Sequence, residues 1–188
     1  MYRAALQGQG NSNPRGWHQA KRFEAVIDLQ TFRQESQSDF PTNKKLKDRL
    51  KRLKPKDLDV RFAENHEEVF QEIDCLDCAN CCKTTSPIFL QTDIDRIAKV
   101  FRMKPSQFID EYLQRDEEGD FVLRSSPCPF LGVDNKCLVY EDRPKACREY
   151  PHTNRKNMAG ILNLSLKNTL ICPAVHKIFR QIEKEYRK

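Results

Sequence analysis

Four of the chain's eight cysteines lie within eight residues, in the order Cys-x2-Cys-x2-Cys-Cys. A two-residue spacing lets one short turn direct two thiolates at a single ion, and both tetrahedral zinc sites and iron–sulfur clusters use it. The remaining cysteines are widely spaced. We predict that all eight are metal ligands: Cys75, Cys78, Cys81, Cys82, Cys128, Cys137, Cys147 and Cys172.

Disulfides are the other common explanation for an even number of cysteines. The start of the chain has no apolar segment of the kind that forms a secretory signal, and no apolar run reaches the roughly 18 residues of a spanning helix. We therefore expect a cytoplasmic protein without a transmembrane segment, whose thiols stay reduced. The adjacent Cys81 and Cys82 also cannot easily pair with each other. Metal binding is the better explanation.

The cysteine pattern leaves the metal open between Zn²⁺ and an iron–sulfur cluster. Eight thiolates suit two zinc ions, or one [4Fe–4S] cluster with a second metal or unused thiols. Cys75, Cys78 and Cys81 match the first three ligands of a bacterial ferredoxin motif, in which the remote ligand precedes a proline. Both Cys128-Pro129 and Cys172-Pro173 offer such a pair. Because adjacent side chains usually diverge, Cys81 and Cys82 should serve different sites or bridge two metals.

Cations near the thiolates are a second expectation. Four thiolates around Zn²⁺ or a [4Fe–4S] cluster leave a charge of about −2, which is unfavourable in a dry interior. We predict that Arg143 or Arg148 lies near the metal and neutralises this charge, which makes both candidate cofactor-binding residues. The alternative is that they are solvated or form ordinary salt bridges. His152 could replace one thiol, but an exposed loop position is the expected one.

We expect a small, cysteine-rich, metal-centred domain that is mostly α with short β hairpin or strand pieces. Residues 1–40 should be a largely disordered or loosely helical extension, 41–73 a basic helix with a lead-in helix, and 74–188 the cysteine-cluster domain. Apolar periodicity predicts helices over 43–54 and 57–73, and others starting near 92, 105, 144 and 173. Alternation predicts a strand at 162–166. Residues 121–123 should form another short strand, and residues 128–139 a hairpin or loop around the turn at 132–136.

The net charge of +6 lies entirely within residues 1–60. Its densest part is the basic helix, Lys44 to Lys56, which could contact nucleic-acid phosphates or an anionic membrane. Leu46, Leu50 and Leu53 instead form an apolar stripe on that helix. The favoured interpretation is a solvated amphipathic helix that packs on the domain.

Motifs that would indicate an enzyme are missing from the sequence. We find no His-Glu-x2-His, no Gly-x-Ser-x-Gly and no P-loop, and we assign no catalytic residue. Eight ligated cysteines would also leave no free thiol as a nucleophile.

Taken together, the motifs resemble a known family. They are Cys75-Leu76-Asp77-Cys78-Ala79-Asn80-Cys81-Cys82, Cys128-Pro129-Phe130-Leu131, Cys137-Leu138-Val139-Tyr140, Arg143-Pro144-Lys145-Ala146-Cys147-Arg148-Glu149-Tyr150-Pro151 and Cys172-Pro173. Their order and spacing, over roughly residues 74–175, are similar to the CxxCxxCC cysteine-cluster family, also called the YkgJ family, of zinc- or iron-chelating proteins.

The resemblance implies metal binding and leaves the metal open. The family is sometimes described as iron–sulfur oxidoreductases, and one branch resembles flagellin lysine methylases, for which this chain is too short. Two functions follow. The first is an iron–sulfur protein with a redox or metal-handling role and an unknown protein or redox partner. The alternative is a zinc-stabilised structural or interaction module without catalytic activity.

Overall fold

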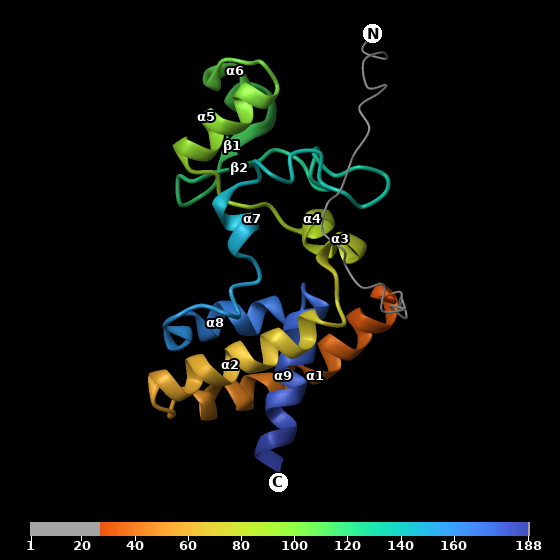
Figure 1. Cartoon of the computed structure of the whole chain (residues 1–188), viewed down its shortest axis with the longest axis vertical. Helices are drawn as coiled ribbons and strands as arrows, with labels where there is room; N and C mark the ends of the chain where they lie inside the picture. Colours follow the sequence, from red (N-terminus) through yellow and green to blue (C-terminus); the bar gives the residue numbers. More distant parts are fainter. Residues whose placement is uncertain (1–26, 188) are drawn as a thin grey trace, which may run out of the picture.

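The computed structural model describes residues 27–187. Of the extension predicted over residues 1–40, residues 1–26 lie outside this range and residues 29–40 are helical. The described chain is mostly α-helical with one small antiparallel sheet, as predicted. Its helices and strands form two groups, each with its own apolar core, and three short helices lie between these groups (Figure 1).

Four long helices form the first group, which we call the helical bundle. They are α1 (Leu29–Leu50), α2 (Pro55–Phe70), α8 (Met158–Asn168) and α9 (Pro173–Arg187). Both N-terminal helices pack against both C-terminal ones. Segments 41–73 and 74–188 therefore contribute to one common core.

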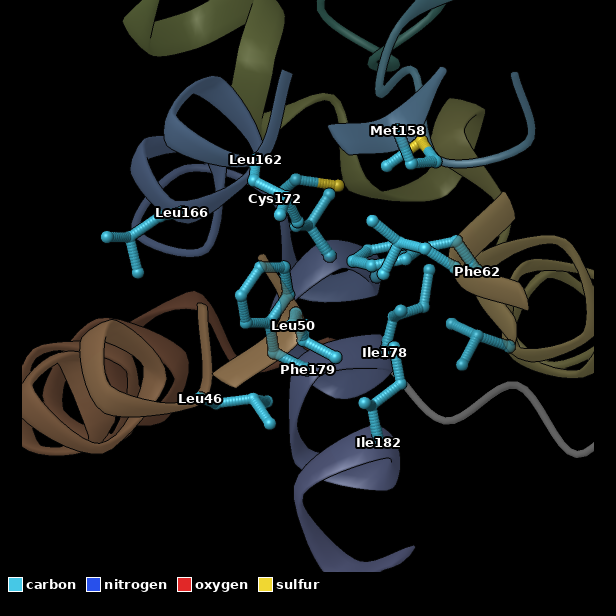
Figure 2. Close-up of a cluster of buried hydrophobic side chains, with 14 residues drawn as sticks. Leu46, Leu50, Phe62, Met158, Leu162, Leu166, Cys172, Ile178, Phe179 and Ile182 are labelled. Carbon is cyan, nitrogen blue, oxygen red and sulfur yellow. The ribbon is translucent and has the colours of Figure 1, made fainter. Parts of the chain in front are cut away.

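The core of the helical bundle is built from stripes of apolar residues. Leu46 and Leu50 of α1 are 2% and 0% exposed, which confirms that the leucine face of the basic helix packs on the domain. Phe62 of α2 meets Phe179 of α9 edge to face, with ring centroids 5.8 Å apart. Figure 2 shows Cys172 among these apolar side chains, so one predicted metal ligand borders this core.

The second group, the small lobe, contains α5 (Gln91–Val100), α6 (Pro105–Tyr112), β1 (Leu113–Arg115) and β2 (Phe121–Leu123). The strands pair antiparallel with Leu113 opposite Leu123, and Phe89 adds an isolated bridge to Phe121. Stacked and tilted rings around Phe108 and Phe130 fill the core. Cys128 and Cys137 pack against it.

Between the two groups lie α3 (Cys75–Cys78), α4 (Asn80–Thr84) and α7 (Lys145–Glu149), which carry five of the eight cysteines (Figure 1). The chain enters this region from α2, passes into the small lobe, and returns through α7 to α8. The cysteine-bearing segments are thus fixed from both sides.

The predicted strand at 162–166 is wrong, because these residues lie within α8. Leu162 and Leu166 are buried, whereas Leu164 is 44% exposed. Residues four apart share one face of a helix, so two of the three alternating leucines also fit a helix. Packing of that face against α1 and α2 decides between the two structures.

Helix ends also differ from the predictions. The predicted helix at 43–54 is the second half of α1, which begins at Leu29, where the Asp28 carboxylate accepts the N–H of Gln30. At the start of α5, the Asp93 carboxylate accepts the N–H of Leu90. The helix predicted to reach residue 73 ends at Phe70.

No single described helix is long and apolar enough to cross a membrane. Only α8 and α9 taken together reach the required length and composition, and the chain bends by 115° between them.

Candidate metal centre

The CxxCxxCC segment folds as two short helical turns. The Asp74 carboxylate accepts the N–H of Leu76 at 2.8 Å and so begins α3. Ala79 has a left-handed backbone, with φ 48°, which ends α3 and lets α4 begin at the next residue. This break places Cys75 and Cys78 on one turn and Cys81 and Cys82 on the next.

A hairpin carries Cys128 and Cys137, as predicted from the sequence. Leu131 and Cys137 form an antiparallel bridge, and Gly132 donates its N–H to the Lys136 carbonyl at 2.7 Å. The N–H of Cys128 donates to the carbonyl of Cys82 at 2.8 Å. The hairpin is therefore fastened directly to the second turn of the CxxCxxCC segment.

Helix α7 holds Cys147 in a position set by α5. The guanidinium of Arg96 donates to the carbonyls of Asp142 and Arg143, and Asp93 accepts from both Arg96 and the N–H of Lys145. Asp93 is only 1% exposed. Sequence reasoning missed this pair, whose only signal is the spacing of an acid and a base three residues apart on a helix.

Cys172 is brought to the CxxCxxCC segment by Asn80. The Asn80 amide donates to the carbonyl of Ile171 at 2.6 Å, and Asn80 itself is 3% exposed. Cys172, at the start of α9, is 8% exposed. A cysteine that lies 90 residues from Cys82 in the sequence thereby joins the same region.

The thiols are held in surroundings that favour their neutral form. Burial, followed by the charges of nearby cysteines, raises the pKa of Cys75 to about 11 and that of Cys147 to about 12. Burial likewise raises the pKa of Cys128 to about 11 and of Cys172 to about 12. A metal cation bound among these sulfurs would favour the thiolate form, and would thus oppose the effects of burial and of neighbouring cysteine charges on these pKa values.

Cys81 and Cys82 behave as a coupled pair, with sulfurs 4.0 Å apart. A hydrogen bond from Cys81 lowers the pKa of Cys82 to about 7, and the same bond together with burial raises the pKa of Cys81. The shared hydrogen bond thus favours one thiolate within the pair, and the thiolate is the form that binds a metal.

Backbone amides point at four of the sulfurs. The N–H two residues further along the chain donates to Cys78, Cys128 and Cys137, from Asn80, Phe130 and Val139. Cys172 accepts from the N–H groups of Val175 and, more weakly, Ala174. Such N–H groups stabilise negative charge on sulfur and tune metal–thiolate centres.

Of the two predicted cofactor-binding arginines, Arg143 lies within electrostatic reach of the thiols. Its charge lowers the pKa of Cys75, Cys137 and Cys147 against the larger effect of burial. Its guanidinium lies over the Tyr140 ring, 3.8 Å from the centroid.

Arg148, the second predicted arginine, donates to the carbonyl of Arg143 at 2.7 Å. It thus contacts the backbone of its neighbour. Direct binding of a metal cofactor by either arginine stays a prediction.

Tyr150 is a further residue of the site whose role sequence reasoning missed. Its hydroxyl oxygen is buried without a hydrogen-bond partner. Burial raises the pKa of Tyr150, and the charges of Cys172, Cys81, Cys75 and Cys78 raise it further. The hydroxyl is therefore within electrostatic reach of four of the thiols and, having no hydrogen-bond partner, is available as a donor to one of them. No spacing rule in the sequence indicates this role.

Histidines lie at the edge of this region. His66 and His152 line an open cleft of about 780 Å³ beside α7, together with Lys145, Arg148 and Arg155. Burial lowers the pKa of both histidines. The loop position expected for His152 is confirmed, although the residue is only partly exposed.

As placed, the side chains form no closed coordination shell. Within residues 27–187, no three His, Cys, Asp or Glu side chains converge closely enough to hold a metal ion without moving. The donor set nevertheless suits zinc or iron–sulfur chemistry, because it consists of thiols with backbone N–H groups directed at the sulfurs.

Comparison with known proteins supports the same conclusion. No curated protein and no solved structure gives a significant match to the chain. The family model CxxCxxCC, described as "Putative zinc- or iron-chelating domain", matches residues 74–172, which is just over half of the chain and includes every cysteine. The chain therefore belongs to the CxxCxxCC family of metal-chelating domains.

Proposed function

We propose that the chain carries a [4Fe–4S] cluster held by Cys75, Cys78, Cys81 and Cys172, and that it has a redox or metal-handling role. The observation that carries the proposal is the bond from Asn80 to Ile171, which brings a Cys-Pro pair to the Cys-x2-Cys-x2-Cys triplet. A triplet with a remote Cys-Pro is the ligand pattern of bacterial ferredoxins.

The surroundings of these sulfurs support a redox role. N–H groups are directed at Cys78 and Cys172, the Tyr150 hydroxyl lies near the same sulfurs, and the charge of Lys83 acts on Cys78. Hydrogen bonds and nearby cations stabilise the more negative, reduced state of a cluster. A [4Fe–4S] cluster held by Cys75, Cys78, Cys81 and Cys172 would supply one-electron transfer between a donor and an acceptor protein.

The proposed partner is an unidentified redox protein, and the proposed location is the cytoplasm, whose reducing conditions keep unligated thiols from forming disulfides. The partner would dock near the cysteines, because electron transfer requires proximity. The cleft beside α7, with several cations on its walls, is the proposed contact for an acidic partner surface.

A zinc-stabilised structural or interaction module is the second candidate. It is favoured by the 128–139 hairpin, whose only regular backbone pairing is the single bridge between Leu131 and Cys137. A segment with so little backbone pairing gains the most folding free energy from a structural ion that fixes its ends.

Analysis of protein purified without oxygen distinguishes the two candidates. We expect a brown protein with iron and acid-labile sulfide in equal amounts, whose visible absorption bleaches when dithionite is added. Substitution of Cys172 by serine should remove iron and sulfide together. A colourless wild-type protein that contains zinc and no sulfide would contradict the cluster and favour the module.

A further inference from the structure

The cleft beside α7 has the size and the charge of a small-molecule site. We infer that it binds a phosphorylated organic compound, whose phosphate group lies among Arg148, Arg155 and Lys156. This site is formed by side chains other than the cysteines, so the inference does not rest on the proposed cluster.

Two separate parts of the chain line the cleft. Helix α2 contributes His66 and Phe70, and α7 together with the loop that follows it contributes the remaining residues. The volume of about 780 Å³ falls within the range of roughly 300–1,000 Å³ that is usual for small-ligand pockets. The cleft is therefore large enough to hold an organic molecule.

Positive charge on the walls of the cleft is largely uncompensated. Four cationic side chains line it against a single carboxylate, that of Glu149, which already pairs with Lys145 at 3.6 Å. Arg148 and Arg155 donate to backbone carbonyls. Within residues 27–187, neither these two arginines nor Lys156 forms an ion pair. Such a group of cations favours a ligand with more than one negative charge.

A phosphate group matches these cations better than a carboxylate does. A phosphate monoester carries a charge of about −1.5 to −2 at neutral pH and offers three strong acceptor oxygens. A guanidinium donates two parallel hydrogen bonds to such oxygens, and a lysine adds a compact positive charge. A carboxylate has one charge and two oxygens, and it would leave most of the wall cations without a partner.

His66 supplies a further polar group in a fixed orientation. Its Nδ1 is hydrogen-bonded to the hydroxyl of Thr153 at 2.7 Å, and Thr153 is 0% exposed. With Nδ1 engaged, Nε2 is the ring nitrogen left for a ligand, and it carries the proton when Thr153 is the donor. The His66 ring also lies against that of Phe70, with centroids 4.4 Å apart. This pair provides an aromatic surface for the organic part of the ligand.

Occupation of the cleft would affect the docking of a redox partner. The acidic partner surface proposed above would contact the same cations that hold the phosphate group. A bound phosphorylated compound would therefore compete with that partner.

Titration calorimetry of the full chain tests the inference. Ribose 5-phosphate is the probe and ribose is its control, both at one fixed ionic strength. The double variant Arg155→Gln, Lys156→Gln removes two cations from the cleft. The double variant Arg124→Gln, Lys167→Gln removes two exposed cations that do not line the cleft, so it matches the change in net charge.

We expect wild type to bind ribose 5-phosphate and not ribose. The cleft variant should bind the probe at least about tenfold more weakly, because it loses hydrogen bonds to a charged group, whereas the control variant should bind it as wild type does. His66→Gln should also weaken binding, and it repeats the test from α2 if the loop variant does not fold.

Other results overturn the inference. They are a wild-type protein that does not bind ribose 5-phosphate, or an equal loss of affinity in both double variants, which would indicate attraction by net charge alone. Tighter binding of a hexaglutamate peptide than of ribose 5-phosphate would leave the cleft to an acidic partner surface and exclude the small-molecule site. Iron and sulfide, measured in the same preparations, report on the proposed cluster separately.

Discussion

Substitution of Asp59 by alanine tests how α2 holds the start of α8. The Asp59 carboxylate accepts the N–H of Asn157 at 2.9 Å and that of Met158 at 2.8 Å. Asn157 has a left-handed backbone and its own side chain does not cap the helix. Asp59, which lies in another helix, therefore takes the place of the usual N-cap.

The magnitude follows from the two lost hydrogen bonds. Loss of an N-cap costs about 0.5–2 kcal/mol, and loss of the carboxylate also removes a favourable interaction with the helix dipole. Since Met158 is fully buried, its N–H has little access to water after the substitution. We expect a loss of about 2 kcal/mol, or a Tm lower by roughly 4–8 °C for a protein of this size.

Asp57→Ala is the matched control. Asp57 is exposed in the first turn of α2, so its removal affects only the dipole of that helix, by about 0.3–1 kcal/mol. Both variants are melted by circular dichroism at equal metal content. The reasoning is refuted if Asp59→Ala lowers the Tm no more than Asp57→Ala does.

Three further predictions concern single contacts. Tyr150→Phe should lower the reduction potential of the proposed cluster, because the buried Tyr150 hydroxyl has no other hydrogen-bond partner and a bond from it to a ligand thiolate would favour the reduced state. An unchanged potential in a dithionite titration would argue against this role. Burial lowers the pKa of His176, so the stability that its neutral form contributes is present above its ordinary pKa and is lost as pH falls below about 6.5. Between pH 7.5 and 5.5, the free energy of unfolding measured in urea should therefore fall more for wild type than for His176→Gln. Equal losses would exclude this role. Leu46 and Leu50 anchor α1 on the domain, and Lys44, Lys45 and Lys51 are exposed, so we interpret α1 as a packing helix. Replacing these three lysines with glutamine should therefore leave the affinity for a short nucleic-acid duplex unchanged. A tenfold loss of affinity would instead support nucleic-acid binding.

Elements with strong periodicity could be predicted from the sequence. The apolar face of α9 and the Pro105 start of α6 were both clear, because a helical repeat and a proline in the first turn have local causes. The α8 prediction failed because Leu162 and Leu166 fit either period. Only their packing against two other helices decides the structure.

The candidate site likewise has features that the sequence predicts and features that depend on tertiary contacts. The spacing of Cys75, Cys78 and Cys81 is local and was sufficient to indicate a metal centre. The contribution of Cys172 could be suspected from its proline but depends on the long-range bond from Asn80 to Ile171. The Tyr150 hydroxyl and the Asp93–Arg96 pair act through tertiary contacts that no sequence spacing encodes.

The central claim is that four of these cysteines hold a redox-active iron–sulfur cluster. Electron paramagnetic resonance of wild-type protein, purified without oxygen and reduced with dithionite, tests it most directly. The account predicts a signal from a reduced [4Fe–4S]⁺ cluster that accounts for the iron present and is lost in Cys172→Ser. A folded, zinc-containing protein without such a signal and without sulfide would contradict it.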